Sequence, residues 1–167
     1  PYALEMLAAI LDGHDAARFT KSLIREQLLA VSAGASYDSM ARGPGLFYLD
    51  GAPSKGRTRA DLEDGFRAEI ARVVQDGVAP DELARARAQL VAGQVYKLDS
   101  MFAQAMEIGQ LEAVGITYRQ SKRIVEKLQG VTAEQVQTVA RKYFVDERLT
   151  VAELDPLPAS ATALEGV

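Results

Sequence analysis

Residues Arg18–Gly51, RFTKSLIREQLLAVSAGASYDSMARGPGLFYLDG, decide the fold of this chain. A helix expected over 16–27 leads into an alternating segment, 29–37. One side of that segment carries Leu29, Val31, Ala33, Ala35 and Tyr37. A turn containing Gly43-Pro44-Gly45 then leads into Leu46–Asp50. Alternation with period two that ends at a glycine/proline turn predicts a β-hairpin with one buried face.

Helical spacing of apolar residues occupies most of the remaining chain. Thr58, Ser100 and Thr132 are typical residues for helix N-caps, and Pro80 suits a first helical position. Thr132 with Gln135 predicts a capping box. The expected helices cover 2–11, 16–27, 59–76, 80–96, 101–114, 118–129 and 133–144.

The sequence therefore predicts an α+β fold, an antiparallel sheet with helices packed on one face. The sheet is expected to contain 29–37, 46–51 and the alternating segment 149–154. Three strands make a thin sheet for so many helices, so we expect further strands before Pro1. A hairpin with an unpaired edge recruits partners, so we expect self-association through that edge or the uncovered face. The expected core contains Leu7, Leu11, Leu23, Phe66, Ile70, Leu90, Ile108, Val136 and Val139.

The composition of the chain excludes several kinds of partner and metal site. The 167 residues carry a net charge of -4, which argues against a nucleic-acid partner. There is no cysteine and one histidine, His14, so a two-histidine zinc motif and thiolate metal sites are excluded. No apolar run approaches the roughly 20 residues of a membrane span. We expect a soluble protein of the bacterial periplasm or cytoplasm, with the compartment left open.

Two basic residues are the best isolated candidates for a site. His14 lies in an Asp-Gly-His-Asp loop, where a ligand role and a solvated loop histidine are both open. Arg18, near Lys21 and Arg25, could hold an anion or belong to a solvated basic helix face. Neither forms an active site by itself, so residues and motifs alone predict a domain without catalysis of its own.

Four stretches in this order carry a family resemblance: Ala3–Gly13, Ala17–Leu23, Asp81–Leu90 and Val131–Tyr143. Together with the hairpin they resemble the C-terminal, non-catalytic domain of the pitrilysin/insulinase-type zinc metallopeptidases. Mitochondrial processing peptidase and the core subunits of the bc1 complex belong to the same family. The resemblance covers nearly all of residues 2–156.

The resemblance implies a half-domain of the LuxS/processing-peptidase type, which shapes the wall of a chamber and binds no metal. It implies that zinc is held by an N-terminal domain of the same protein, through an H-x-x-E-H motif. The inactive domain is expected over 1–156, without its first strands, and a flexible tail over 157–167.

One departure from the family concerns an Arg and a Tyr, seven residues apart, that hold the substrate backbone in many active members. The resemblance places Ile24 and Val31 at these two positions, and neither side chain can donate a hydrogen bond. Arg25 lies one residue away, and Leu28 stands where the family often has glycine. We therefore expect no catalytic residue and no metal ligand here, and leave the substrate-binding residues unassigned.

Three classes of function stay open. The first is a domain of a zinc peptidase that supplies chamber wall, peptide-docking surface and contacts for assembly. Its expected partners are the zinc-bearing domain, unfolded peptide and a homologous subunit. The second is a proteolytically inactive scaffold like the bc1 core proteins. The third is an unrelated helix-rich α+β binding module.

Overall fold

The computed structural model describes residues 1–155, without the side chains of residues 120–122. The tail expected over 157–167 lies outside the described residues. The elements run, in chain order, α1 (Tyr2–Asp12), the π-helix η1 (Phe19–Glu26), β1 (Ala30–Tyr37), β2 (Phe47–Pro53), α2 (Arg59–Asp76), α3 (Pro80–Tyr96), η2 (Lys97–Asp99), α4 (Met101–Ala113), η3 (Tyr118–Gln120), α5 (Ser121–Gln129), α6 (Ala133–Tyr143) and η4 (Asp146–Arg148).

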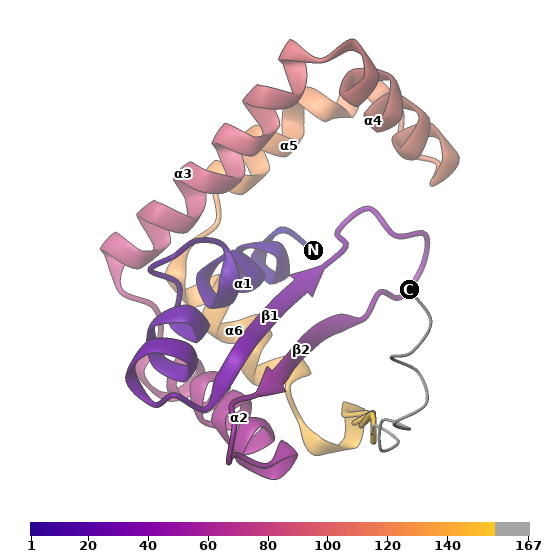
Figure 1. The fold of residues 1–167 in the computed structure, drawn as a ribbon. Helices are drawn as coiled ribbons and strands as arrows, with labels where there is room; N and C mark the ends of the chain where they lie inside the picture. Colours follow the sequence, from indigo (N-terminus) through magenta and orange to yellow (C-terminus); the bar gives the residue numbers. More distant parts are fainter. Residues whose placement is uncertain (156–167) are drawn as a thin grey trace, which may run out of the picture.

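The hairpin forms the sheet of the described residues, with β1 and β2 antiparallel. Helices α1, α2 and α6 lie on one side of it (Figure 1). Tyr37 pairs with Phe47 and Ala35 with Leu49 on the side that faces these helices. The predicted α+β class, with helices packed on one face of an antiparallel sheet, is confirmed.

The prediction of a third strand over 149–154 is wrong. Leu149–Asp155 has no strand conformation in the structure, and Leu149, Val151 and Leu154 are exposed. Arg59, at the start of α2, holds this segment through ion pairs of 3.2 Å to both Glu153 and Asp155. Alternation shows that a segment suits a strand, but a strand also needs a neighbouring backbone to pair with.

The alternation expected along β1 is broken at Val31. Ala30 pairs with Pro53 and Ser32 with Ala52, so one residue of β1 lies between two consecutive pairs. This β-bulge shifts the register, which leaves Ala30 and Ala33 buried while Val31 is 65% exposed. Val31 therefore does not belong to the buried face on which the sequence placed it.

The main core lies between the hairpin, α1, η1, α2, α6 and the start of α3. Leu7, Leu11, Leu23, Ile70 and Val136 are buried in it, as expected. Phe66 is half-buried and its ring lies 5.0 Å from that of Phe19, while Leu90 and Val139 are also half-buried. Ile108 is 45% exposed, so its assignment to the core is wrong.

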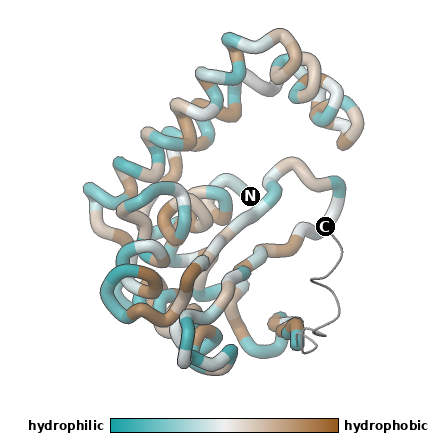
Figure 2. Tube along the Cα trace, viewed as in Figure 1, coloured by the Kyte–Doolittle hydropathy of each residue, from teal (hydrophilic) through white to brown (hydrophobic). Residues whose placement is uncertain are grey.

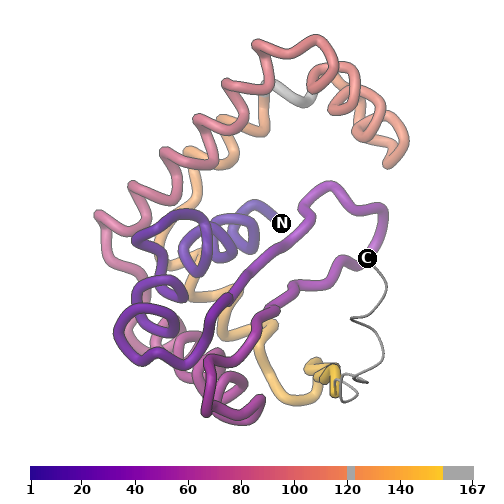
Figure 3. The backbone as a smooth tube through the Cα atoms, viewed as in Figure 1, coloured from indigo at the N-terminus to yellow at the C-terminus, as the bar shows by residue number. Residues whose placement is uncertain are grey.

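Ile108 is exposed because α4 lies beyond the main core, at the end of an extension that α3 and α5 form from it. The chain runs out along α3, turns into α4 and returns along α5, as Figures 1 and 3 show. We call residues 80–129 the arm. A small second core of Leu111, Ile124 and Leu128 holds it together.

Local signals located the helix ends well. Thr58 with Asp61, and Thr132 with Gln135, form complete capping boxes, and Ser100 caps α4. Gly77 ends α2 with φ +77°, which glycine adopts most easily. The helix expected over 16–27 is shorter and wider, because its residues 19–26 form a π-helix.

Candidate functional site

The side of the hairpin opposite the core has no helix packed on it among the described residues (Figure 1). Three cross-strand pairs line this side, which we call the open face: Ser32 with Ala52, Gly34 with Asp50, and Ser36 with Tyr48. Ser32, Ser36, Tyr48 and Asp50 are exposed. Hydroxyl groups, a phenol and a carboxylate therefore project from a flat backbone surface.

Glycine at position 34 lets the carboxylate of Asp50 lie over the strand. A Cβ atom added at Gly34 would lie 2.9 Å from Asp50 Oδ1. On the helix side of β1, the backbone N–H of Ala35 donates to Asp12 Oδ2 at 3.3 Å. Burial raises the pKa of the Asp12 carboxyl, the Ala35 hydrogen bond lowers it, and the charge of Asp50 raises it. The carboxylates of Asp12 and Asp50 therefore both lie close to β1.

Sequence reasoning singled out neither Tyr48 nor Asp50. A signal was present, because Tyr48 and Asp50 alternate with the apolar Phe47 and Leu49 along β2. That pattern predicts which side of a strand faces solvent, but it does not show which solvent-facing side chains have a function.

The resemblance assigned the Arg and Tyr positions of the family to Ile24, in η1, and Val31, in β1. Ile24, in η1, is half-buried and packs against the main core. Val31 lies at the bulge and is exposed, and Arg25 is exposed beside Ile24. The structure therefore presents aliphatic groups at both positions.

Leu28 connects η1 to β1 in a left-handed conformation. Its φ is +51°, the one positive value among non-glycine residues of the described chain. A β-carbon in this region clashes with the backbone, which costs about 1–2 kcal/mol. The backbone at Leu28 thus has the conformation that glycine adopts without strain.

His14 lies near the end of α1 and turns one nitrogen toward its own loop. His14 Nδ1 accepts the backbone N–H of Ala16 at 3.0 Å, and its Nε2 is buried without a hydrogen-bond partner in the described chain. Within residues 1–155, no three His, Asp or Glu side chains are grouped so that they could hold a metal ion.

Both interpretations offered for Arg18 are wrong. Its guanidinium donates from Nε to Glu82 Oε1 at 2.7 Å, and from Nη2 to Glu82 Oε2 and Gly77 O at 2.9 Å. Because these groups occupy it, Arg18 is a structural link to α3 rather than an anion site or a solvated charge. Lys21 and Arg25 remain exposed.

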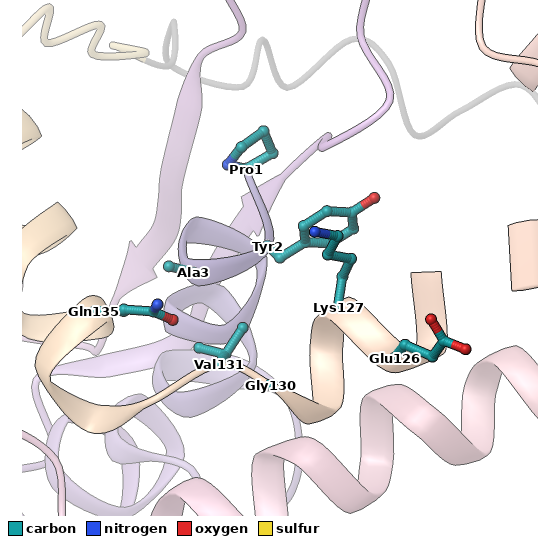
Figure 4. A pocket seen from close by; sticks show the side chains of 8 residues that line it. All are labelled: Pro1, Tyr2, Ala3, Glu126, Lys127, Gly130, Val131 and Gln135. Atoms are coloured by element: carbon teal, nitrogen blue, oxygen red, sulfur yellow. The ribbon is translucent and has the colours of Figure 1, made fainter. Parts of the chain in front are cut away.

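A cavity of about 520 Å³ lies where the start of α1 meets the connection between α5 and α6. Figure 4 shows Lys127 leaning toward the ring of Tyr2, while Glu126 points away from it. The polar groups of this cavity do not converge on one point, so it has the shape of a surface hollow rather than of an active site.

The sequence profile of the peptidase M16 inactive domain matches residues 1–90. The chain belongs to this family. Among curated proteins it is similar to YmxG of Bacillus subtilis (strain 168), named an uncharacterized zinc protease, with 23% identity over 146 residues. That match covers 87% of this chain and 35% of YmxG.

Solved structures show the same fold as this M16 inactive domain. One is the inactive peptidase domain of a protein designated a zinc protease from Bordetella parapertussis, with TM-score 0.79 and 18% identity. That match covers 95% of this chain and 85% of the other. A protease from Helicobacter pylori matches with TM-score 0.79 and 15% identity, over 88% of this chain and 35% of that one.

The M16 inactive domain thus spans about a third of YmxG and of the Helicobacter protease. The helices of the described residues include none with the length and apolar composition of a membrane span.

Proposed function

We propose that this domain forms part of the wall of a peptidase chamber, docks unfolded peptide on the open face of its hairpin, and contributes to assembly with a zinc-bearing domain. One observation carries the proposal: helices cover one side of the hairpin, while Ser32, Ser36, Tyr48 and Asp50 stay exposed on the other. A flat, polar face beside strand edges suits an extended chain, whose backbone groups also need hydrogen-bond partners.

The zinc ion belongs, in this proposal, to the N-terminal domain of the same protein. The residues of this chain do not fit it, because they include one histidine and no cysteine. The role of the chain is therefore to bind and orient peptide. Positioning of that kind can contribute several kcal/mol to catalysis.

We further propose that the pair of side chains that fixes the peptide backbone comes from a homologous partner subunit. Ile24 and Val31 cannot donate side-chain hydrogen bonds, which supports a division of labour between two polypeptides. A second candidate is a scaffold that has lost proteolysis, like the bc1 core proteins. It draws on the same observation, since such a subunit needs no peptide-holding pair.

Peptide docking is tested by measuring the fluorescence anisotropy of a labelled unfolded peptide with the full-length protein. Tyr48→Ser should weaken binding about tenfold, the loss of roughly 1.4 kcal/mol. Tyr118→Ser is the matched control, because Tyr118 is 46% exposed, Tyr48 is 57% exposed, and Tyr118 lies on the arm. Equal affinities of wild type and Tyr48→Ser would contradict docking on the open face.

The division of labour is tested by assaying the full-length protein on unfolded peptides, alone and with a homologous subunit. Cleavage in the mixture alone, lost when the Arg or Tyr of the subunit is replaced, supports the proposal. Robust cleavage without the subunit rules it out. No cleavage in either case, with a stable complex of the two proteins, favours the scaffold.

A further inference from the structure

The outer end of the arm carries large apolar side chains that face solvent. We call this group the arm tip; it comprises Val95, Tyr96, Leu98, Met101, Phe102, Met106 and Ile108. Met101 is 88% exposed and Phe102 is 76% exposed. Figure 2 shows apolar stretches along α4, at the end of the arm. Exposed apolar groups that cluster in this way mark a contact surface.

The two sides of α4 differ in a way that shows which one lacks a partner. The inner side carries Glu107 and Leu111. Leu111 is buried, and Glu107 forms an ion pair with Lys97 at 3.6 Å. The outer side carries Met101, Phe102, Ala105, Ile108 and Gly109, all exposed and uncharged; the next residue on this side is Glu112, which accepts the backbone N–H of Tyr118 at 2.8 Å. A solvent-facing helix surface normally carries charged and polar residues, so this one is suited to burial.

The size of the arm tip matches one side of a protein interface. Its side chains expose roughly 800 Å², given their exposed fractions and the ordinary areas of side chains of this size. The largest apolar patch of a typical monomer is about 300–600 Å². A standard interface buries about 800 Å² on each partner.

We propose that the arm tip binds the arm tip of a second copy of this chain, with the two α4 helices antiparallel about a two-fold axis at Ala105. This register places Met101 opposite Gly109, where an added Cβ would meet no atom within 4 Å. It also places Phe102 opposite Ile108, and both side chains are exposed.

The apolar surface is therefore complementary to itself in shape, as an isologous interface requires. The small residues Ala105 and Gly109 let two helices approach closely, and the flexible side chain of Met101 can adapt to the space it meets.

The interface is tested by sedimentation equilibrium of the 167-residue chain between about 1 and 200 µM, a range in which mass action reveals a reversible dimer. Wild type should show a monomer–dimer equilibrium, and Phe102→Ser should weaken it at least about tenfold. Leu154→Ser is the matched control, because Leu154 is 85% exposed outside the arm. Thermal unfolding in dilute solution, where both proteins are monomeric, should be the same for Phe102→Ser and wild type and so show that the variant is folded.

Disulfide trapping locates the axis. Because the chain has no cysteine, an Ala105→Cys variant should form a disulfide-linked dimer on mild oxidation. A Ser36→Cys variant, on the open face, should not. A wild-type chain that stays monomeric over the whole range overturns the proposal. So does a dimer that Phe102→Ser leaves intact and that Ser36→Cys captures.

Discussion

Arg18, the residue before η1, and Glu82, in the first turn of α3, form a bidentate ion pair with Nε–Oε1 at 2.7 Å and Nη2–Oε2 at 2.9 Å. Both side chains are 17% exposed, and Nη2 also donates to Gly77 O at the end of α2. One guanidinium thus joins three helices. The Glu82 hydrogen bond raises the pKa of Arg18, burial lowers it, and the charge of Glu82 raises it further.

Replacing Arg18 by alanine should lower the free energy of unfolding by about 2–3 kcal/mol, because it leaves Glu82 largely buried without its partner. Urea unfolding followed by circular dichroism measures this. Arg67→Ala is the control: Arg67 also pairs with two carboxylates but is 47% exposed. It should cost much less than Arg18→Ala, because solvent screens the exposed pairs of Arg67. Equal losses would show that burial does not set the strength of the Arg18 pair.

Leu28→Gly should stabilise the protein by about 0.5–1 kcal/mol. The change removes the strain of a β-carbon at φ +51°, and this gain exceeds the entropy cost of glycine in the unfolded chain. Leu149→Gly is the control, because Leu149 has φ -86°, where glycine brings the entropy cost alone. Thermal unfolding of both variants checks the opposite signs, and destabilisation by Leu28→Gly would contradict the strain.

Gly51→Ala should destabilise the protein by about 2–3 kcal/mol, a typical cost of overpacking a close contact. A Cβ at Gly51 would lie 2.6 Å from Ser32 O and 3.2 Å from side-chain atoms of Leu62 and Phe66. Gly93→Ala is the matched change on α3, where the added carbon meets nothing within 4 Å. It should stabilise by about 0.5–1 kcal/mol through helix propensity. Denaturant midpoints distinguish the two.

The stability of the Asp12→Asn variant, relative to that of wild type, should increase as pH rises. Burial raises the pKa of Asp12 in the folded protein. Its ionised form therefore costs stability above the ordinary carboxyl pKa of about 4. Asparagine keeps the acceptor for Ala35 N–H without the charge. The free energy of unfolding of the variant minus that of wild type should increase from pH 4 until Asp12 is fully ionised.

For Asp61→Asn, the stability of the variant relative to wild type should change with pH in the opposite direction. Hydrogen bonds from the backbone and side chain of Thr58 lower the pKa of Asp61. Its ionised form therefore adds stability, which is fully present above the unfolded pKa and is lost as pH falls through the folded one. The free energy of unfolding of Asp61→Asn minus that of wild type should therefore decrease as pH rises. Parallel curves for the two variants would show that neither environment acts as described.

The 167-residue chain should bind no stoichiometric zinc and cleave no peptide at neutral pH. One histidine and no cysteine cannot supply the usual nitrogen and sulfur ligands. Titration calorimetry with zinc measures the first expectation. A tight one-to-one complex that His14→Ala abolishes would overturn it.

Helix ends were readable in the sequence because caps are local. Thr58, Ser100 and Thr132 satisfy backbone groups within three residues of themselves, so no distant contact is needed to recognise them. The hairpin was readable for the same reason, since its two strands follow each other across one turn.

Features that depend on contacts between residues far apart in the sequence could not be predicted from it. Leu149–Leu154 alternates like a strand, yet it lies beside Arg59 without pairing in the structure. Ile108 has helical core spacing, but α4 turns it outward. Arg18 resembled a member of a basic face because Glu82, its partner, lies 64 residues away in the sequence. The open face needed the strand register before Tyr48 and Asp50 could be placed together.

The bulge at Val31 means that β1 contains one residue more than regular pairing with β2 requires. In a regular strand, a one-residue deletion between η1 and Ala33 would rotate every later side chain to the opposite side of the sheet. Here the deletion could be absorbed by converting the bulge to regular pairing, with Ala33, Ala35 and Tyr37 still facing the core. The distance along the chain from η1 to the sheet can therefore change by one residue during evolution while the hydrophobic interior stays as it is.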